Sequence, residues 1–268
     1  MNPNIEQIHN YNHIHPTAVI DDMVEMGEGN YVGPFCYLAG YLQIGNKNRF
    51  EAHCAVGTRP EHTDYNKPGR CRIGDDNWIR EFTTIHSGTD DLTTVGSNII
   101  MLRGAHVAHD CVIEDGVTLS CNAIMLGHVH VMKYSNCGSG CLVHQYQVVG
   151  SYSMVGMGCV VPKKSRLEPG HTWVGNPARR LKTNMYALDK HDVDLLYIIQ
   201  ERTKIVKKVL ALKLSKKEII DKKRISTILK KIKKESLRKK IDPKITHRIW
   251  KNMIWSYIDF EKRNFKKK

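Results

Sequence analysis

The sequence predicts a mainly β protein, a parallel β-helix of about eight coils followed by a C-terminal α-helical domain. Two observations lead to this fold class. Aliphatic or similar residues recur every six positions through much of the chain, for example at Met101, Val107, Ile113 and Leu119. The last part of the chain lacks this repeat and is rich in lysine. Because three six-residue units form one triangular coil of parallel strands, this period favours a coil over an ordinary sheet or a helix.

The repeats divide the predicted β-helix, assigned to residues 1–183, into three runs. The first run begins at Ile14 and continues without a slip to Val56. Residues 58–72 interrupt it with polar residues, proline and glycine, so we expect an external loop there. Repeats resume at Ile73, a second external loop is expected at 87–94, and the last run ends near Leu167. Loops that interrupt a regular scaffold often determine specificity.

Residues 184–268 are predicted to form a basic α-helical domain of about three helices. Residues 201–268 contain 25 Lys or Arg and 7 Asp or Glu, whereas the whole chain has a net charge of +14, so the basicity belongs to this tail. Such a charge favours an acidic partner, namely a phosphorylated cofactor, an acidic carrier protein, a membrane surface or a nucleic acid. An ordinary solvated helix face is the alternative. No nucleic-acid motif accompanies the lysines, so no nucleic-acid partner is expected.

The eight cysteines are predicted to be buried, unpaired side chains. Five of them fall on the small inward position of the repeat: Cys36, Cys54, Cys111, Cys141 and Cys159. This placement favours small buried side chains in a reducing compartment over disulfides or a zinc site. The N-terminus lacks the basic and apolar regions of a signal peptide, and no apolar run is long enough for a transmembrane segment. A cytoplasmic location is therefore expected.

The predicted functional site lies between Arg103 and Gln147. Residues about eighteen positions apart stack on neighbouring coils, at about the 4.8 Å spacing of adjacent strands. His109 is therefore expected beneath Gly127, and Asp110 beneath His128. A histidine, a carboxylate, a second histidine and a glycine amide would thus converge. The remaining repeat-borne histidines are expected to be exposed corner residues: His15, His53, His62, His86 and His130.

These residues resemble the left-handed β-helix acyltransferases, a hexapeptide-repeat family that includes UDP-N-acetylglucosamine O-acyltransferase and relatives that N-acylate nucleotide-linked amino sugars. The resemblance extends from Ile14 to about Leu181. It is carried by the segments IHPTAVI, IGDDNWIREFTTIHSGT, GAHVAHDCVI, LGHVHV and VHQYQVVG. It implies a left-handed coil and a homotrimer with sites at the subunit interfaces.

The resemblance also implies roles for individual residues. His109 matches the general base that takes a proton from the sugar, Asp110 the carboxylate beside it, and Gly127 the glycine whose N–H faces the thioester oxygen. The residues expected to bind substrate are Asp64, His106, His128, His144 and Gln145. The coil ends in GNPARRLK, as in coenzyme A dependent sugar acetyltransferases, so Arg179, Arg180 and Lys182 are expected to bind cofactor phosphates.

The leading hypothesis for function is an acyltransferase that moves an acyl group from a thioester, expected to be acyl-CoA, to the amino group of a nucleotide-linked deoxyamino sugar for surface polysaccharide. The first alternative is 3-O-acylation of UDP-N-acetylglucosamine in lipid A synthesis with acyl carrier protein as donor, for which the basic tail would be a docking surface. A non-catalytic trimeric scaffold is an alternative of another class. No metal is expected, although His109 and His128 could approach each other closely enough to share zinc.

Overall fold

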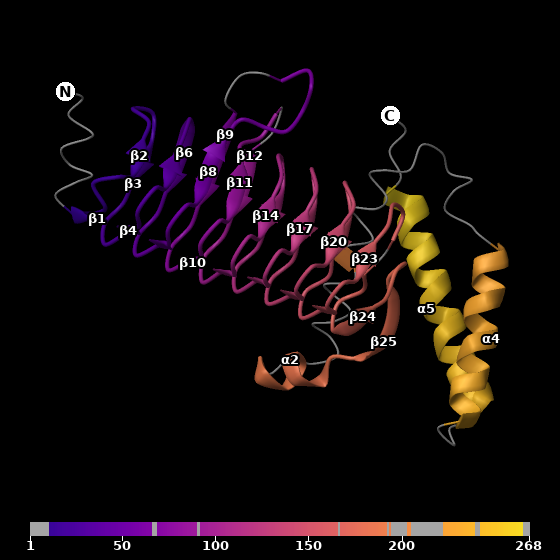
Figure 1. Ribbon diagram of the computed structural model, residues 1–268. Helices are drawn as coiled ribbons and strands as arrows, with labels where there is room; N and C mark the ends of the chain where they lie inside the picture. The colour runs from indigo at the N-terminus through magenta and orange to yellow at the C-terminus, as the bar shows by residue number, and fades with distance from the viewer. Residues whose placement is uncertain are drawn as a thin grey trace. The chain divides into compact units, whose positions relative to one another are not determined.

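The computed structural model describes residues 11–65, 69–89, 92–165, 167–191, 193, 203–204, 222–238 and 242–264. The chain divides into two compact units, Met1–Ile198 and Ile199–Lys268. In the first unit short strands stack coil upon coil, as Figure 1 shows from β1 to β24. The predicted parallel β-helix is confirmed.

Three parallel sheets form the walls of this β-helix. The first wall contains β1 (His13–Ile14), β4 (Tyr31–Val32), β7 (Arg49–Phe50), β10 (Trp78–Ile79), β13 (Ile100–Met101), β16 (Thr118–Leu119), β19 (Asn136–Cys137), β22 (Met154–Val155), β24 (His171–Val174) and β25 (Arg179–Thr183). The second wall contains β2 (Val19–Ile20), β5 (Tyr37–Leu38), β8 (Ala55–Thr58), β11 (Thr84–His86), β14 (His106–Val107), β17 (Ile124–Met125), β20 (Leu142–Val143) and β23 (Val160–Val161). The third wall contains β3 (Glu25–Met26), β6 (Tyr41–Ile44), β9 (Arg70–Ile73), β12 (Leu92–Val95), β15 (Val112–Ile113), β18 (His130–Val131) and β21 (Val148–Val149).

The coils number about nine, because strands from β1 to β24 pair in parallel along the first wall. The sequence predicted about eight. β25 pairs antiparallel with β24 and closes the wall. Residues eighteen apart face each other where no loop intervenes, as Val107 and Met125 do between β14 and β17.

Aliphatic side chains at the first repeat position fill the interior of the coil. Phe50, Met101, Leu119 and Met125 are fully buried there. Burial of side chains of this size stabilises the fold by about 1.5–3 kcal/mol each. All eight cysteines are unpaired, and all but the half-buried Cys121 are buried, as the repeat predicted. The interior is therefore close-packed and leaves functional side chains only the outer faces and the corners.

Two loops interrupt the coil near the second wall, and both are shorter than the sequence indicated. The first lies between β8, which ends at Thr58, and β9, which already begins at Arg70; the second lies between β11, which ends at His86, and β12, which begins at Leu92. β9 and β12 pair with each other over four residues, so the chain rejoins the coil earlier than the hydrophobic repeat alone shows. Both loops leave the coil after strands of the second wall, β8 and β11.

A buried row of asparagines runs along one corner. The Asn48 side-chain amide donates to Asn30 Oδ1 at 3.0 Å, and Asn48 Oδ1 accepts from the Asn77 amide at 2.8 Å. These side chains also bond to backbone groups of the neighbouring coil, for example Asn48 to the Gly74 carbonyl at 2.8 Å. The row fixes the alignment of successive coils, since each amide is satisfied only by its neighbours.

Helix α2 (Met185–Lys190) belongs to the first unit. Its buried residues Ala187 and Leu188 pack against Tyr152 of the coil. The first helix of the predicted helical segment thus belongs to the β-helix unit. The boundary between the two units lies after Ile198, whereas the sequence predicted it after residue 183.

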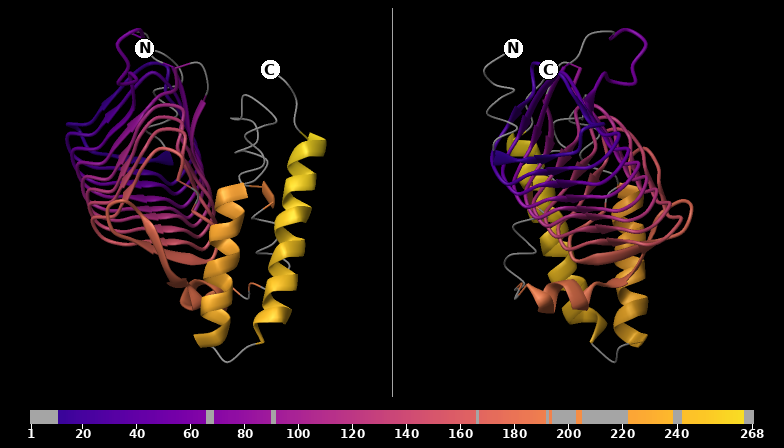
Figure 2. Two further views of the ribbon diagram at one scale, coloured as in Figure 1. Left: turned by 90° about the vertical axis from the view of Figure 1, so that its right-hand side faces the viewer. Right: turned by 60° about the vertical axis from the view of Figure 1, so that its left-hand side comes forward.

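The second unit contains α4 (Lys222–Arg238) and α5 (Pro243–Asn264), which lie side by side in both views of Figure 2. Ser236 Oγ and Thr246 Oγ1 join these helices at 2.6 Å. Of residues 192–220, which belong to the predicted helical domain, only 193 and 203–204 are described. Among the described helices, none combines the length and the apolar character needed to cross a membrane.

Candidate active site

The predicted stacking of the site residues is confirmed. The His128 N–H donates to the His109 carbonyl at 3.0 Å, and the Tyr146 N–H donates to the Gly127 carbonyl at 3.1 Å. Asp110, His128 and Tyr146 each adopt a positive φ, of 58°, 60° and 61°. This repeated corner conformation aligns their side chains in a row along the outside of the coil.

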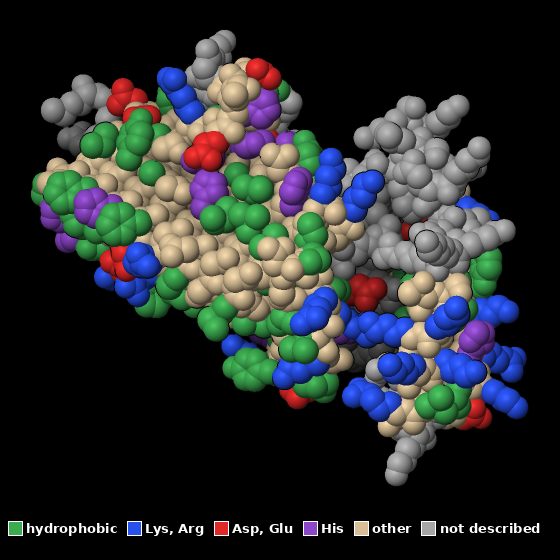
Figure 3. Space-filling view, turned by 45° about the vertical axis from the view of Figure 1, so that its right-hand side comes forward, with side chains coloured by type: hydrophobic (Ala, Val, Ile, Leu, Met, Phe, Trp, Pro, Cys, Tyr) green, Lys and Arg blue, Asp and Glu red, His purple; other side chains and the backbone are tan. Residues whose placement is uncertain are grey.

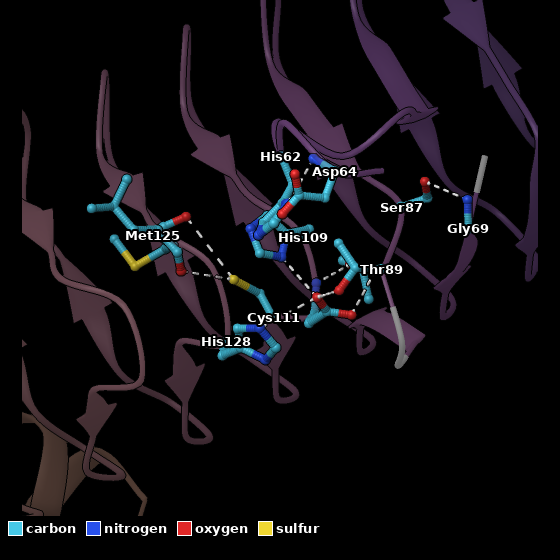
Figure 4. Close-up of polar contacts among 12 residues, drawn as sticks. His62, Asp64, Gly69, Ser87, Thr89, His109, Cys111, Met125 and His128 are labelled. Atoms are coloured by element: carbon cyan, nitrogen blue, oxygen red, sulfur yellow. Dashed lines mark hydrogen bonds and ion pairs between the residues drawn. The ribbon is translucent and has the colours of Figure 1, made fainter. Parts of the chain in front are cut away.

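His109 and Asp110 form a buried pair at the centre of the site, and Figure 4 shows His109 between His62 and His128. His109 Nδ1 lies 2.7 Å from Asp110 Oδ2. A carboxylate can only accept here, so Nδ1 carries the hydrogen, and in the neutral form of the ring Nε2 has a lone pair. A buried carboxylate that fixes this tautomer leaves Nε2 able to accept a proton from a substrate.

Thr89 completes the surroundings of the Asp110 carboxylate, and the sequence analysis did not find it. Its N–H donates to Asp110 Oδ1 at 2.8 Å, and its hydroxyl donates to Oδ2 at 2.6 Å. The Asp110 N–H donates in turn to Thr93 Oγ1 at 2.8 Å. Thr89 belongs to the second loop, so the loop holds the carboxylate in place. The only sequence signal was the position of this short loop one coil before AHVAHDC.

Gly127 lies directly against the imidazole of His109. A Cβ at this position would be 2.6 Å from His109 Cε1 and 2.7 Å from Nε2. Within the part of the chain that the structure describes, the Gly127 N–H donates no hydrogen bond. The glycine therefore leaves both space beside the base and a free donor next to it.

The first loop returns over the second wall and covers two further histidines. His86 is only 8% exposed, so its expected place at an exposed corner is wrong. Its ring packs edge to face on His106 with centroids 5.0 Å apart. Burial lowers the pKa of both imidazoles. Glu61 of the loop comes within 3.9 Å of His86 and 4.0 Å of His106, which explains why the corner is closed.

Asp64 and His62 also come from the first loop. The Asp64 N–H donates to His62 Nδ1 at 3.3 Å, and the Asp64 side chain is exposed. The His62 ring meets His109 edge to face, with centroids 5.8 Å apart. The structure thus brings the loop that carries Asp64 to the proposed base, although His62 itself was expected only at an exposed corner.

His128, His144 and Gln145 lie on the coils beyond His109. His128 Nε2 is 3.5 Å from Asp110 Oδ2, and Tyr146 stacks on the His128 ring with centroids 4.4 Å apart. His144 is half-buried, whereas Gln145, stacked over Gly127, is exposed. These residues line the same outer face as His109, and Figure 3 shows histidine side chains gathered on a face of the first unit.

Arg179, Arg180 and Lys182 are not brought to His109. They lie on exposed β25 at the end of the first wall. β24, which pairs with β25, belongs to the fourth coil beyond the one that contains β13 and β14. At about 4.8 Å per coil, this places them roughly 19 Å farther along the axis. Arg180 instead contacts His171 at 3.3 Å.

Two groups of side chains have the composition of a metal site. Asp110 Oδ2 lies near both His109 and His128, but His109 Nδ1 and the two Thr89 donors already occupy this carboxylate. Glu61, His86 and His106 form the second group, and their facing atoms are farther apart than hydrogen-bonded atoms. The first arrangement suits proton transfer, whereas the second holds three possible ligand atoms within 4.8 Å of one another.

The fold and the stacked site define a left-handed β-helix protein built from hexapeptide repeats. Its relatives are UDP-N-acetylglucosamine O-acyltransferases, so the resemblance is confirmed. The chain is 32% identical over 160 residues to acyl-[acyl-carrier-protein]–UDP-N-acetylglucosamine O-acyltransferase of Gloeothece citriformis, covering 59% of the chain and 57% of that relative. For the protein of the same name from Paraburkholderia phymatum, identity is 35% over 165 residues, covering 53% and 63%. The chain therefore spans less than two thirds of these relatives' length.

Solved structures share the fold over more of the chain. LpxA from Acinetobacter baumannii matches with a TM-score of 0.58 and 26% identity, covering 80% of this chain and 84% of that one. The UDP-N-acetylglucosamine acyltransferase of Francisella novicida matches with a TM-score of 0.56 and 26% identity, covering 88% of each chain. Residues 185–262 match the family model for chorismate mutase type II.

Proposed function

We propose that this chain is an acyltransferase that moves an acyl group from acyl carrier protein to a hydroxyl of UDP-N-acetylglucosamine. The observation that carries the proposal is the buried His109–Asp110 pair with the Gly127 N–H beside it. The names of the relatives favour this donor and acceptor over acyl-CoA and an amino sugar. The basic residues of β25, which supported coenzyme A, lie about four coils from His109, so their position adds no support for that donor.

The proposed mechanism uses His109 twice. Nε2 takes the proton of the attacking hydroxyl while the oxygen forms a bond to the thioester carbonyl carbon. Asp110 holds the imidazolium through Nδ1–H. The Gly127 N–H donates to the oxygen that becomes negative in the tetrahedral intermediate. When the intermediate collapses, the carbon–sulfur bond breaks and His109 returns its proton to the leaving thiolate.

The acceptor is proposed to lie along the face lined by His106, His128 and His144, with Asp64 and Gln145 at its edges. Polar side chains at these positions can bind sugar hydroxyls and phosphates. The second wall forms only one side of this face. Gln145 and Tyr146 are exposed, so the opposite side is open to solvent in a single chain. We therefore propose that the chain acts as a homotrimer in which a neighbouring copy closes the site.

The acyl carrier protein is proposed to dock on the lysine-rich surface of α4. Lys230, Lys231, Lys233 and Lys234 are all exposed there, and Figure 3 shows Lys and Arg side chains crowded over the second unit. Exposed positive charge of this density steers an acidic protein and loses its effect as salt rises. A charge-reversed Lys233→Glu, Lys234→Glu variant should raise KM for the carrier protein several-fold and leave kcat nearly unchanged.

A second candidate function concerns the helical part, because residues 185–262 match the chorismate mutase type II model. A hollow of about 510 Å³ between α4 and α5 is lined by Ser226, Lys230, Lys233, His247 and Trp255, among others. Lysines there could bind the carboxylates of chorismate. Loss of chorismate absorbance on addition of the intact chain would support this activity, and an unchanged spectrum would reject it.

Release of free thiol tests the main proposal. Acetyl-CoA and a 3-hydroxyacyl carrier protein would each be offered with UDP-N-acetylglucosamine and with a nucleotide-linked amino sugar. Turnover with the carrier protein and UDP-N-acetylglucosamine supports the proposal, whereas turnover only with acetyl-CoA and the amino sugar would restore the N-acyltransferase hypothesis. No thiol release from any pair would favour a non-catalytic scaffold.

A further inference from the structure

Glu61, His86 and His106 bring three ligand atoms together above the second wall. His86 Nε2 lies 3.9 Å from Glu61 Oε1, and His106 Nε2 lies 4.0 Å from Glu61 Oε2. The facing atoms of all three residues lie within 4.8 Å of one another. His86 and His106 come from adjacent strands, β11 and β14, whereas Glu61 comes from the first loop.

A salt bridge does not explain why Glu61, His86 and His106 lie close together. The Glu61 side chain is 72% exposed, so solvent screens its charge and its contacts with the two rings are not close ion pairs. The separations of 3.9 and 4.0 Å are also too long for hydrogen bonds. Neutral imidazoles with free lone pairs and a carboxylate are, however, a common ligand set for a divalent cation.

The two imidazoles are also oriented as metal ligands are. His106 Nδ1 lies 2.7 Å from Thr84 Oγ1, a contact that directs Nε2 toward Glu61. Metal-bound histidines usually have such a partner on the other ring nitrogen. His86 Nδ1 is buried without a partner among the described residues, so the polar side of that ring available for a ligand is Nε2.

We propose that Glu61, His86 and His106 bind one divalent cation of the zinc class. Tetrahedral zinc with bonds near 2.1 Å separates its ligand atoms by about 3.4 Å. Glu61 would therefore move by roughly half an ångström toward the two rings. That movement is available because its side chain is 72% exposed and lies on a loop, whereas both rings are held by the coil. A fourth position remains open to water or to an anionic oxygen.

The cation would fix the first loop to the coil. Glu61 would be joined to β11 and β14 by metal bonds, and His62 and Asp64, beside His109, would be held with it. The site shares His106 with the proposed acceptor face but uses neither His109 nor Asp110, and cation binding does not depend on the proposed acyl transfer. Its occupancy can therefore be tested without an activity assay.

Zinc binding to the intact chain tests this site directly. The full chain, stripped with a chelator and dialysed, would be titrated with Zn²⁺ against a chromophoric competitor, with folding of every variant checked by circular dichroism. We expect one equivalent per chain, and loss of that equivalent in Glu61→Gln and in His106→Asn. Thr84→Val, which removes only the partner of His106, should weaken binding about 10-fold.

Asp64→Asn is the matched control, because Asp64 is an exposed carboxylate on the same loop. It should bind zinc like the wild type. The proposal is overturned if the wild type retains no zinc, or if Asp64→Asn weakens binding as much as Glu61→Gln. It is equally overturned if His128→Asn abolishes binding while His106→Asn retains it, because the metal would then occupy the His109–Asp110–His128 group.

Discussion

Replacing Gly127 with alanine should disable the base while leaving the coil intact. The added methyl group would lie 2.6 Å from His109 Cε1 and 2.7 Å from Nε2. Non-bonded carbon atoms are normally about 3.5–4.0 Å apart, so the ring would have to move by about 1 Å. The ring is held by Asp110 at 2.7 Å, and a displacement of this size in a catalytic group costs roughly 100-fold in rate. We therefore expect kcat for thiol release to fall about 100-fold.

Gly140→Ala is the control for this experiment. A Cβ at Gly140 meets nothing within 4 Å, but the residue has a φ of +66°, so alanine there costs about 1 kcal/mol of backbone strain. It should lower the melting temperature slightly and leave kcat unchanged. If Gly127→Ala, with a melting temperature no lower than that of Gly140→Ala, kept kcat within about threefold of wild type, the placement of the base against this glycine would be refuted.

Three further predictions follow from the site and the core. His109→Ala should lower kcat by about 10²–10⁴-fold, and Asp110→Asn by a comparable factor because the amide no longer fixes the Nδ1–H tautomer, both measured as initial rates of thiol release. Burial lowers the pKa of His86 and His106 below 6.5, so the unfolded chain binds protons that the folded chain does not. The free energy of unfolding should therefore fall as the pH drops below about 6.5, and urea denaturation of a His86→Asn, His106→Asn variant should show a smaller fall. Asn48→Ala should lower the free energy of unfolding by about 2–4 kcal/mol, since it leaves neighbouring buried amides unpaired, and retention of wild-type stability would contradict the role of the row.

The stacking of the site could be predicted from the sequence because it depends on a fixed period. His109 and Gly127 are eighteen residues apart with no insertion between them, so counting alone places one over the other. Thr89 could not be found in this way. It lies 21 residues before Asp110, within the second loop, and its two hydrogen bonds depend on how that loop returns to the coil.

The burial of His86 was missed for the same reason. Its position in the repeat is that of an exposed corner, and only the path of residues 59–65 covers it. The GNPARRLK motif also does not determine which acyl donor the chain uses. Arg179 and Arg180 follow a familiar sequence pattern, but they lie about 70 residues, or about four coils, after His109.

The asparagine row suggests how this architecture can change its chemistry without losing its shape. Asn48 and Asn77 are 29 residues apart, because the first loop lies between them, yet they bond as closely as Asn30 and Asn48, which are 18 apart. The second loop likewise leaves the bond from the Ile99 N–H to Asn77 Oδ1 intact, at 2.8 Å. The scaffold therefore registers its coils independently of what is inserted between them. Loops of other lengths could be grafted at these two points, as modular parts, while the coils beneath keep their alignment.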